Sequence, residues 1–591
     1  MRIVSKLLST TAVVLAALAL QACGGGGGGE APAPAPNTDT NTGGGTTVTG
    51  GGTTPSVNTT TPTQTVVVTG TATYEAVPYR TVTVAGQGSA GSLDYSAAVR
   101  KPIRGVTVQA VKNSGLATEE ILATSSTTAT GGYTLNVPIN TQYSVRMRAE
   151  MLKTTGAALW NVTVLDNTFN DALWVVETGV GVTTTTNAVR NINAATTWNG
   201  TGYNQSTRPA GIFTMLDTLY DSIQQIATTQ PTVTFPKLTV HWSPANTDSA
   251  ATADLPLGQL GGKTFFRSAT TTTFVAGVTT TVATRQIYVL GKADVDSDEF
   301  DRGILAHEFG HYLQNVFSVA NVSLGGGHGL GNRLDMTLAF SEGWGNAYSS
   351  IARNDPVYAD AGGVSQASGF TINFGNTAVI TNKGWFNEIS VANSIYLLFK
   401  DAGFAPVWNA LTGPMRTQAS LPTIFSFAAA VRGAGVPAAT TALNNVLTAN
   451  LISTTSDEWG NNETNNGGAA SNLPVYTPLA FNTATSTCYN TVNMTDATDI
   501  NKLGMVKYHR HTLTAANAGA RNVRVNFEAN RDVDFDVFQN NVRVARAAAL
   551  TPAGGTFEAK AVNLSAGEVV IRTRDFITNT APLTCATLLL N

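Results

Sequence analysis

The chain has 591 residues, of which 35 are basic and 38 are acidic, and its formal net charge at pH 7 is −3. This length exceeds what one hydrophobic core normally serves, so several domains are expected. No basic run lies beyond the N-terminus. The balanced charge therefore excludes the electrostatic footprint of a protein that binds nucleic acid or adheres to an anionic membrane surface.

The N-terminus has the pattern of an export signal. Arg2 and Lys6 precede an apolar stretch at residues 10–20, which is too short to span a bilayer as a permanent helix. Residues 20–23, Leu-Gln-Ala-Cys, resemble a bacterial lipobox. The resemblance implies that residues 1–22 are a lipoprotein signal peptide and that Cys23 is acylated, with membrane attachment only through this lipid. An ordinary cleavable signal with an incidental cysteine is the alternative.

The residues that follow Cys23 extend this prediction of an exported bacterial lipoprotein. Gly24 fits the usual sorting pattern for the outer membrane, and it leaves open whether the protein faces the periplasm or the outside. Residues 23–65 are rich in Gly, Thr and Ala-Pro pairs, a composition that cannot bury enough apolar surface to fold. We therefore expect a disordered tether here.

Residues 66–173 are expected to form an all-β domain. Residues 102–108 and 130–135 resemble the prealbumin-like sandwich modules called carboxypeptidase regulatory-like domains. That resemblance implies an accessory role in folding or binding, and a spacer without any ligand is the alternative. Short alternating runs predict the strands, at 69–74, 105–111 and 132–137.

A mixed region of helices and strands is expected over residues 174–472. Pro209 suits the first turn of a helix that continues through Ile223. Alternating runs predict strands at 237–242 and 285–290, and the chain from 337 to about 451 is expected to be mostly helical.

A His-Glu-x-x-His motif lies shortly after the second of these strands. On a helix, His307 and His311 share one face, so that two imidazole nitrogens can hold one ion. Zinc accepts such ligands in a tetrahedral site, and Glu308 can take a proton from an activated water. So short a pattern also occurs by chance in long proteins, and its context must decide its meaning.

The start of this helix is expected to be capped by Asp296, with Glu299 reaching back to it. Asp298 and Asp301 would place negative charge at the positive end of the helix dipole. A calcium loop is the poorer explanation of residues 294–298, because Glu299 stands where such a loop requires Gly.

Glu342 is the best candidate for the third protein ligand that a catalytic zinc needs. It lies in a predicted second helix at 338–349 among apolar neighbours, where an uncompensated carboxylate is costly. Two glycines in this helix permit close packing against the first. The metzincin continuation is excluded, because Gln314 and Phe317 occupy the positions of its Gly and His.

A helix that bears this motif, followed by a second helix that bears a Glu, resembles the gluzincin metallopeptidases, of which the thermolysin-like branch is the best known. The resemblance spans residues 285–400 and implies that Glu308 is the general base. It also implies that Asn346 stands in for an Asp of the family and accepts a hydrogen bond from the first zinc histidine. The implied zinc ligands are His307, His311 and Glu342.

The same resemblance implies two features of a substrate cleft. The strand at 285–290 would line the cleft and pair with extended peptide through its backbone, unless it is simply an interior strand. A His and a Tyr would stabilise the oxyanion, but no His stands at the start of the helix near Trp385. The remaining candidates are His328, Tyr348 and Tyr396.

The C-terminal part, residues 473–591, is expected to be a β-sandwich. Alternation at 523–527 and 533–537 predicts strands, and Asn540-Asn541 predicts a hairpin turn. Residues 532–538 resemble the C-terminal domains appended to many secreted bacterial peptidases.

Cysteines and histidines of this part lead to two further predictions. With Cys23 as the lipid site, Cys488 and Cys585 form an even pair in an exported protein, so we expect one disulfide. His509 and His511 alternate on a predicted strand, and we expect both at the surface.

Together these patterns predict a multidomain α+β protein with an N-terminal all-β sandwich, a central zincin-like metallopeptidase domain made of a small sheet and helices, and a C-terminal β-sandwich. The expected activity is that of a Zn²⁺-dependent endopeptidase acting on a peptide or protein substrate. Two alternatives stay open. One is a non-catalytic surface binding protein on the same scaffold, and the other is a zinc hydrolase of a non-peptide substrate.

Overall fold

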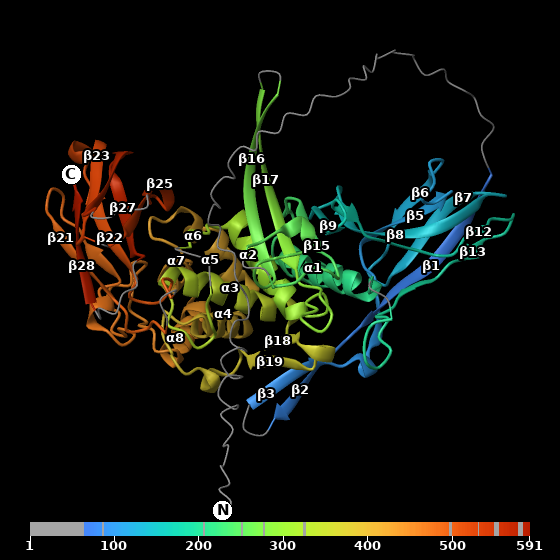
Figure 1. Ribbon diagram of the computed structural model, residues 1–591, viewed down its shortest axis with the longest axis horizontal. Helices are drawn as coiled ribbons and strands as arrows, with labels where there is room; N and C mark the ends of the chain where they lie inside the picture. Colours follow the sequence, from blue (N-terminus) through green and yellow to red (C-terminus); the bar gives the residue numbers. More distant parts are fainter. Residues whose placement is uncertain are drawn as a thin grey trace, which may run out of the picture.

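The described residues form a mixed α+β, multidomain-like architecture in which helices occupy the centre and β-sheets lie at both ends (Figure 1). The predicted signal peptide, Cys23 and the tether up to residue 63 lie outside the described residues. Among the residues described, no helix is long and apolar enough to cross a membrane. The computed structural model describes residues 64–84, 88–204, 207–249, 252–275, 278–322, 327–495, 499–529, 531–548, 555–576 and 583–591.

The first sheet is built around one long strand, β1 (Thr65–Ala76). Val68, Ala72 and Tyr74 of this strand are buried, whereas Thr69 is exposed, as the period of two in a strand dictates. This alternation covers one face of the sheet with the core. The strands that pair with β1 are β4 (Val99–Pro102), β7 (Gly132–Pro138), β13 (Ala188–Val189) and β14 (Ile192–Ala194).

A second, larger sheet runs from the N-terminal β region into the centre of the molecule. β9 (Trp160–Asp166) pairs in parallel with β15 (Leu238–Trp242), so the sheet continues across the boundary predicted at residue 173. Short strands β10 (Ala172–Leu173), β11 (Val175–Glu177) and β12 (Gly181–Val182) pair with β9 or β8. The order of the main strands is β16 (Phe265–Val275), β17 (Val278–Val289), β15 (Leu238–Trp242), β9 (Trp160–Asp166), β8 (Gln142–Lys153), β5 (Val106–Lys112) and β6 (Glu120–Ser126).

The expectation that the strand at 285–290 pairs with substrate is wrong. This segment belongs to β17, which is hydrogen-bonded to β16 on one side and to β15 on the other. A strand with two partners has no free backbone groups to offer a peptide. The edge of the sheet is formed by β16 instead.

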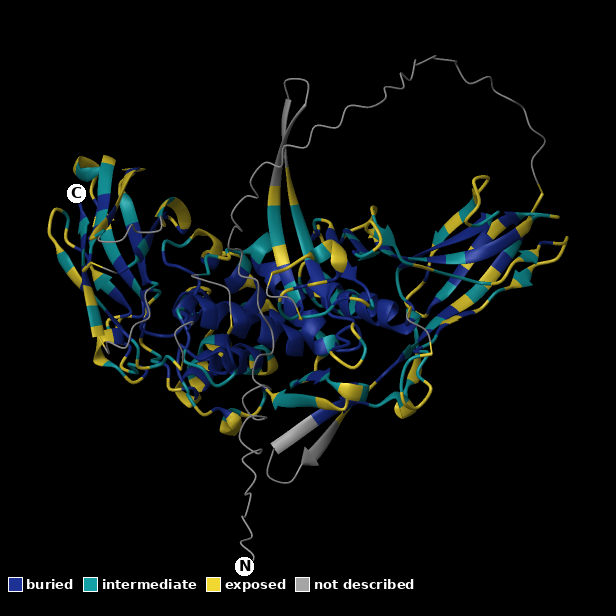
Figure 2. Ribbon diagram, viewed as in Figure 1, coloured by how far each residue is buried: buried dark blue, intermediate teal, exposed yellow. Residues whose placement is uncertain are grey.

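Helices form the buried centre of the molecule (Figure 2). Residues 354–387 depart from the mostly helical prediction for residues 337–451. They form β18 (Val357–Gly362) and β19 (Ser368–Asn373), which share a sheet with β2 (Tyr79–Val84) and β3 (Gly88–Leu93). The helices are α1 (Pro209–Thr229), α2 (Arg302–Phe317), α3 (Met336–Arg353), α4 (Glu388–Ala402), α5 (Phe404–Thr412), α6 (Pro414–Thr417), α7 (Ile424–Gly433) and α8 (Pro437–Ala449).

The helix that carries the histidine motif begins later than predicted. α2 starts at Arg302, and Asp301 holds its N-cap position without a side-chain capping hydrogen bond. Asp296 therefore does not cap the helix. Glu299 does not reach back to it either, because its carboxylate forms a buried ion pair with Arg208 at 2.8 Å. An N-cap pattern depends on neighbouring residues, whereas Asp296 and Glu299 form ion pairs with residues distant in the sequence.

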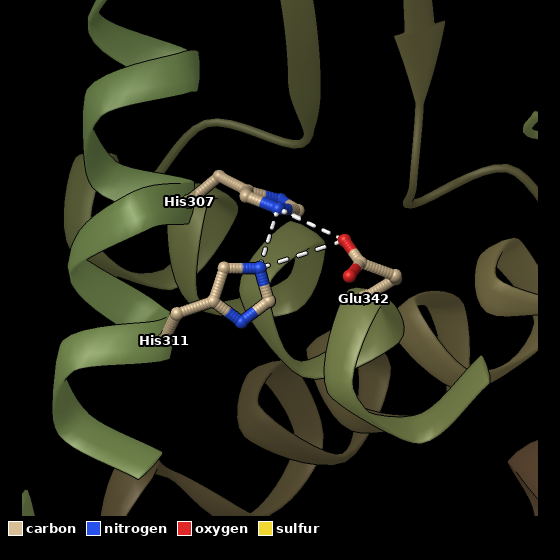
Figure 3. Close-up of side chains that lie close together, drawn as sticks. All are labelled: His307, His311 and Glu342. Carbon is tan, nitrogen blue, oxygen red and sulfur yellow. Dashed lines mark hydrogen bonds and ion pairs between the residues drawn. The ribbon is translucent and has the colours of Figure 1, made fainter. Parts of the chain in front are cut away.

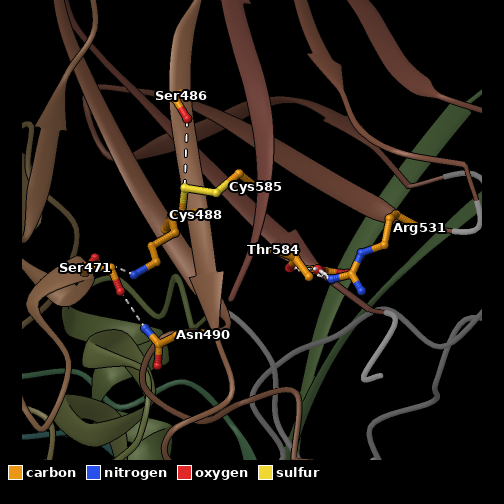
Figure 4. The surroundings of a disulfide bond; sticks show 9 residues. Ser471, Ser486, Cys488, Asn490, Arg531, Thr584 and Cys585 are labelled. Atoms are coloured by element: carbon orange, nitrogen blue, oxygen red, sulfur yellow. Dashed lines mark hydrogen bonds and ion pairs between the residues drawn. A yellow bond between two sulfur atoms is a disulfide. The ribbon is translucent and has the colours of Figure 1, made fainter. Parts of the chain in front are cut away.

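The C-terminal part is a sandwich of two sheets whose facing side chains share one core. The predicted disulfide is confirmed, and Cys488 and Cys585 join the neighbouring strands β21 (Thr485–Asn490) and β28 (Leu583–Leu590) (Figure 4). The predicted turn is confirmed as well, since Asn540 and Asn541 have φ of 51° and 61°. The strands are β20 (Tyr476–Pro478), β21 (Thr485–Asn490), β22 (Val506–Leu513), β23 (Gly519–Asn526), β24 (Val533–Gln539), β25 (Val542–Ala547), β26 (Phe557–Leu564), β27 (Gly567–Asp575) and β28 (Leu583–Leu590).

The expectation that His509 lies at the surface is wrong. His509 is fully buried on β22, and neither ring nitrogen has a hydrogen-bond partner among the described residues. Both faces of β22 are covered here, because Leu513 packs into the sandwich core whereas Tyr508 packs into the central core. Period-two alternation cannot reveal such a doubly covered strand. His511 is partly exposed and donates to the carbonyl of Leu479 if its Nδ1 carries the proton.

Burial of His509 predicts that the sandwich loses stability in acid. Burial lowers the pKa of His509 to about 4, and the nearby Lys507 acts in the same direction. Between pH 7.5 and pH 5 the unfolded chain therefore binds a proton that the folded chain does not. The free energy of unfolding should fall by about 2 kcal/mol over this range. Hydrogen exchange of β22 in the full chain, corrected for intrinsic rates, measures this change.

The variant His509→Gln should lose most of that pH dependence, whereas His511→Gln should keep it. Equal pH dependence in wild type and His509→Gln would contradict the assignment.

Candidate metal site

Two glycines let helices α2 and α3 approach each other closely. A Cβ added at Gly310 would lie 3.0 Å from the Cα of Gly345, and one added at Gly345 would lie 2.8 Å from the ring of His307. Trp344 Nε1 donates a hydrogen bond to the carbonyl of Gly310 at 2.8 Å. Gly343 plays the same part on the other side of α3, against Val391 of α4. The predicted close packing is thus present and uses Gly345 against α2.

This approach brings three donor side chains to one point (Figure 3). His307 and His311 lie one turn apart on α2, with their Nε2 atoms 3.0 Å apart. Glu342 projects from α3, and its Oε2 lies 3.3 Å from Nε2 of His307 and 3.5 Å from Nε2 of His311. All three side chains are buried. The three residues predicted as ligands are therefore together.

Asn346 contacts the first histidine, as the gluzincin resemblance implies. Its Oδ1 lies 2.9 Å from Nδ1 of His307 and accepts a hydrogen bond from it. The proton on Nδ1 leaves the lone pair of Nε2 free to face Glu342, which is the tautomer that a metal ligand requires. His311 has a weaker contact, since the Oγ of Ser341 lies 3.4 Å from its Nδ1.

Glu308 is held from the edge strand of the sheet. The backbone N–H of Phe266 in β16 donates to its Oε2 at 2.7 Å. Its Oε1 has no hydrogen-bond partner in the described part of the chain. Burial raises the pKa of Glu308 to about 8, and the neighbouring carboxylate of Glu342 adds to the rise. One carboxylate oxygen is therefore fixed and the other is left to exchange a proton.

His328 and Glu388 form a second pair beside the three donors. Nε2 of His328 lies 3.5 Å from Oε2 of Glu342, and its Nδ1 lies 3.2 Å from Oε2 of Glu388 at the start of α4. Burial acts to lower the pKa of His328, but Glu342 and Glu388 outweigh it and raise the pKa to about 9. His328 was predicted from the sequence as a site residue, whereas Glu388 was not. The signal for Glu388 was an acid in the first turn of an otherwise apolar helix.

The two tyrosine candidates do not reach the donors. Tyr348 lies in the core, where its hydroxyl donates to the carbonyl of Ser222 at 2.7 Å. Tyr396 packs on Phe399 and near Gly375. Of the three predicted oxyanion-stabilising residues, the structure brings His328 alone to the site.

The donor set fits a metal cation. Oε2 of Glu342 has no hydrogen-bond partner among described groups, although it is buried and faces three imidazoles. Burial acts to raise the pKa of Glu342, but His328, His311 and His307 outweigh it and hold this pKa well below its usual range. A buried carboxylate oxygen that faces three imidazole nitrogens is stabilised by positive charge at short range. Two imidazole nitrogens and this oxygen can supply one ion with three ligands.

The close approach of the helices predicts that Gly345→Ala weakens metal binding. The new methyl group would displace the ring of His307 from its hydrogen bond with Asn346. Loss of such an orienting contact typically costs about 10-fold or more in metal affinity. Metal content after dialysis against buffered zinc measures the effect.

Gly433→Ala is the matched control for this substitution, because a Cβ at Gly433, the last residue of α7, meets no atom within 4 Å. Equal zinc affinity in both variants would contradict the proposed geometry.

Comparisons with known proteins do not identify this chain. No family model matches it, and no curated protein does. The pre-peptidase C-terminal domain of collagenase from Bacillus anthracis is 9% identical and matches with a TM-score of 0.15, over 20% of this chain and 94% of that one. A periplasmic inhibitor of g-type lysozyme from Aeromonas hydrophila is 12% identical, with a TM-score of 0.13 over 20% of this chain and 94% of that one. A 9R-lipoxygenase from Cyanothece is 9% identical, with a TM-score of 0.17 over 64% of this chain and 68% of that one. At such scores these likenesses carry no argument about fold or function.

Proposed function

We propose that this protein is a zinc-dependent peptidase of the gluzincin type, in which His307, His311 and Glu342 hold the metal and Glu308 is the general base. The observation that carries the proposal is the convergence of three metal-binding atoms with a carboxylate whose second oxygen has no partner among the described residues. Such a set is the minimum for metal-assisted hydrolysis.

The spacing of the donor atoms supports zinc. Zinc bonds to His nitrogen and carboxylate oxygen are about 2.0–2.1 Å long, and a tetrahedron with such bonds has edges of about 3.3 Å. The distances among the three donor atoms are 3.0, 3.3 and 3.5 Å. Two imidazoles and one carboxylate are also a common catalytic zinc set, with the fourth position left for water or substrate.

The chain's own groups define the roles around that position. Bound zinc would supply positive charge that acidifies a water and polarises a peptide carbonyl. The positive charge of bound zinc would offset the burial that raises the pKa of Glu308, so Glu308 would accept the proton of the attacking water on Oε1 while the N–H of Phe266 holds its Oε2 in place. The same carboxyl group can then deliver that proton to the leaving amine. No covalent intermediate with the protein is needed.

His328 is the group that we assign to the oxyanion. Its Nε2 lies on the side of Glu342, and Glu388 holds its other nitrogen. The carboxylate of Glu388 beside Nδ1 stabilises the doubly protonated ring, in which Nε2 can donate to a developing negative charge. Glu388 is a positioning residue, since it acts through His328.

The edge of β16 is the place for an extended substrate. β16 ends its sheet, and the N–H of Phe266 points from this free edge to Glu308. A peptide that pairs with the following residues of β16 would bring a carbonyl next to the general base. This assignment replaces β17 as the substrate strand.

A place outside the cytoplasm accords with this function. The Cys488–Cys585 disulfide is typical of exported proteins. Together with the lipobox-like residues 20–23, it supports an exported, lipid-anchored peptidase.

Glu308→Gln tests the assignment of the base. The amide cannot accept the proton, so peptide hydrolysis should fall by at least about 100-fold, whereas zinc content should stay at one per chain. Cleavage of casein or of a diverse peptide library measures the rate. Glu120→Gln on exposed β6 is the control and should leave the rate unchanged. Wild-type activity in Glu308→Gln, or purified protein without stoichiometric zinc, would refute the proposal.

His328→Gln and Glu388→Gln test the assignment of the oxyanion stabiliser. Loss of one donor to an oxyanion typically costs about 100- to 1,000-fold in kcat, so kcat should fall far more than KM rises. Zinc content should stay unchanged. His511→Gln in the sandwich is the matched control. Unchanged kcat in both variants would contradict the assignment.

Burial of the site favours one rival, a protein that holds zinc without catalysis. His311, the most exposed of the three ligands, is only 7% exposed, and His328 lies 3.5 Å from Oε2 of Glu342, from where a shift of its side chain would add a fourth ligand. X-ray absorption distinguishes these states. A zinc ion bound by three histidines, together with no cleavage of the peptide library, would establish the rival. A zinc ion bound by two histidines, with oxygen atoms as its other ligands, supports the peptidase.

A further inference from the structure

A second group of buried acids lies just before α2. Asp296, Asp298 and Asp301 come from the segment that leads into this helix, and Asp360 comes from β18. One carboxylate oxygen of each lies within 4.8 Å of one oxygen of every other. Their exposed fractions are 3%, 2%, 3% and 9%. Four acids from two distant segments thus share one buried point.

Protein donors satisfy only part of these carboxylates. Asp298 accepts from the hydroxyl of Thr264 through Oδ2, and Asp301 accepts from the N–H of Ala361 through Oδ2. Their Oδ1 atoms are buried and accept no hydrogen bond from an N–H or O–H donor among the residues described, and the same is true of Oδ1 of Asp296. Asp296 and Asp298 also lie close enough to share a proton with each other. The three Oδ1 atoms without a donor therefore belong to side chains of the same cluster. Each of them can accept a further hydrogen bond or bind a cation.

The positive charge of the described side chains near the four acids is also smaller than the negative charge that the four acids would carry. Lys263 lies 3.2 Å from Oδ2 of Asp296 and is the described cation that contacts the group. The nearby Arg302 is engaged elsewhere, by Asp221 and Asp217. One lysine thus faces four buried carboxylates. A divalent cation would balance the remaining negative charge.

We propose that Asp296, Asp298, Asp301 and Asp360 bind one calcium ion. The ligand set is all oxygen, which suits a hard cation and not zinc. Calcium bonds to oxygen are 2.3–2.6 Å long, so two ligands on opposite sides of the ion lie about 5 Å apart, and all four acids fall within that span. The three Oδ1 atoms without a donor become ligands.

The ion would hold together the segments that surround the candidate zinc site. Asp301 is the N-cap residue of α2. Thr264, which contacts Asp298, precedes by two residues the Phe266 that holds Glu308. Tyr358 of β18 packs edge-on against His307. Calcium therefore ties α2, β16 and β18 into one frame, and this role does not require that the zinc site be catalytic.

Calcium titration of the full-length protein tests this inference. After removal of calcium with a chelating resin, calorimetry should show one calcium ion per chain, and saturating CaCl₂ should raise Tm by roughly 3 to 8 °C. Asp298→Asn and Asp360→Asn should each weaken calcium binding by at least about 10-fold. Without calcium, both variants should be at least as stable as wild type, because each removes one of the crowded negative charges.

Asp294→Asn is the matched control. Asp294 is exposed on the same segment, and Asn can keep its positive φ of 61° and its hydrogen bond from Ser365. This variant should bind calcium as wild type does. The inference is overturned if wild type shows neither binding heat nor a Tm rise at millimolar calcium, if both cluster variants respond fully, or if Asp294→Asn loses the response as well. None of these measurements depends on peptidase activity, so the calcium inference can fail or hold independently of the proposed function.

Discussion

The contact of two glycines between α2 and α3 is the constraint on which the site depends. Any side chain larger than hydrogen at Gly310 or Gly345 would push the helices apart or displace the ring of His307. Zinc-type bonds of about 2 Å leave no room for such a shift. The whole arrangement of His307, His311 and Glu342 is therefore a consequence of how closely two backbones pack.

A second constraint is the burial of charge, because several acidic side chains lie where water cannot reach them. Moving one ionised group out of water costs several kcal/mol even after relaxation. Glu342 is offset by three imidazoles, Glu299 by Arg208, and Glu388 by His328. The group of Asp296, Asp298, Asp301 and Asp360 is contacted by Lys263 as its one cation among the described residues. This imbalance sets them apart from the other buried acids.

The order of the strands decides which strand has a free backbone edge next to the site. β17 lies closer in sequence to the histidine motif, but it has partners on both sides. β16 lies at the edge and supplies the N–H that holds Glu308. One hairpin thus separates the two roles, with β17 in the interior and β16 at the free edge.

The sequence by itself determined the features that depend on nearby residues or on residue type. The spacing of His307 and His311, the isolated acid Glu342, the even pair of cysteines and the Asn540-Asn541 turn all depend on short-range pattern or on residue type, and the structure brings these residues together as expected. Tertiary structure alone decided which strand lies at the edge, that Glu388 faces His328, that His509 is buried, and that Asp296 joins Asp360 instead of capping a helix. Each of these depends on segments far apart in the chain, and no local pattern records which of them will meet.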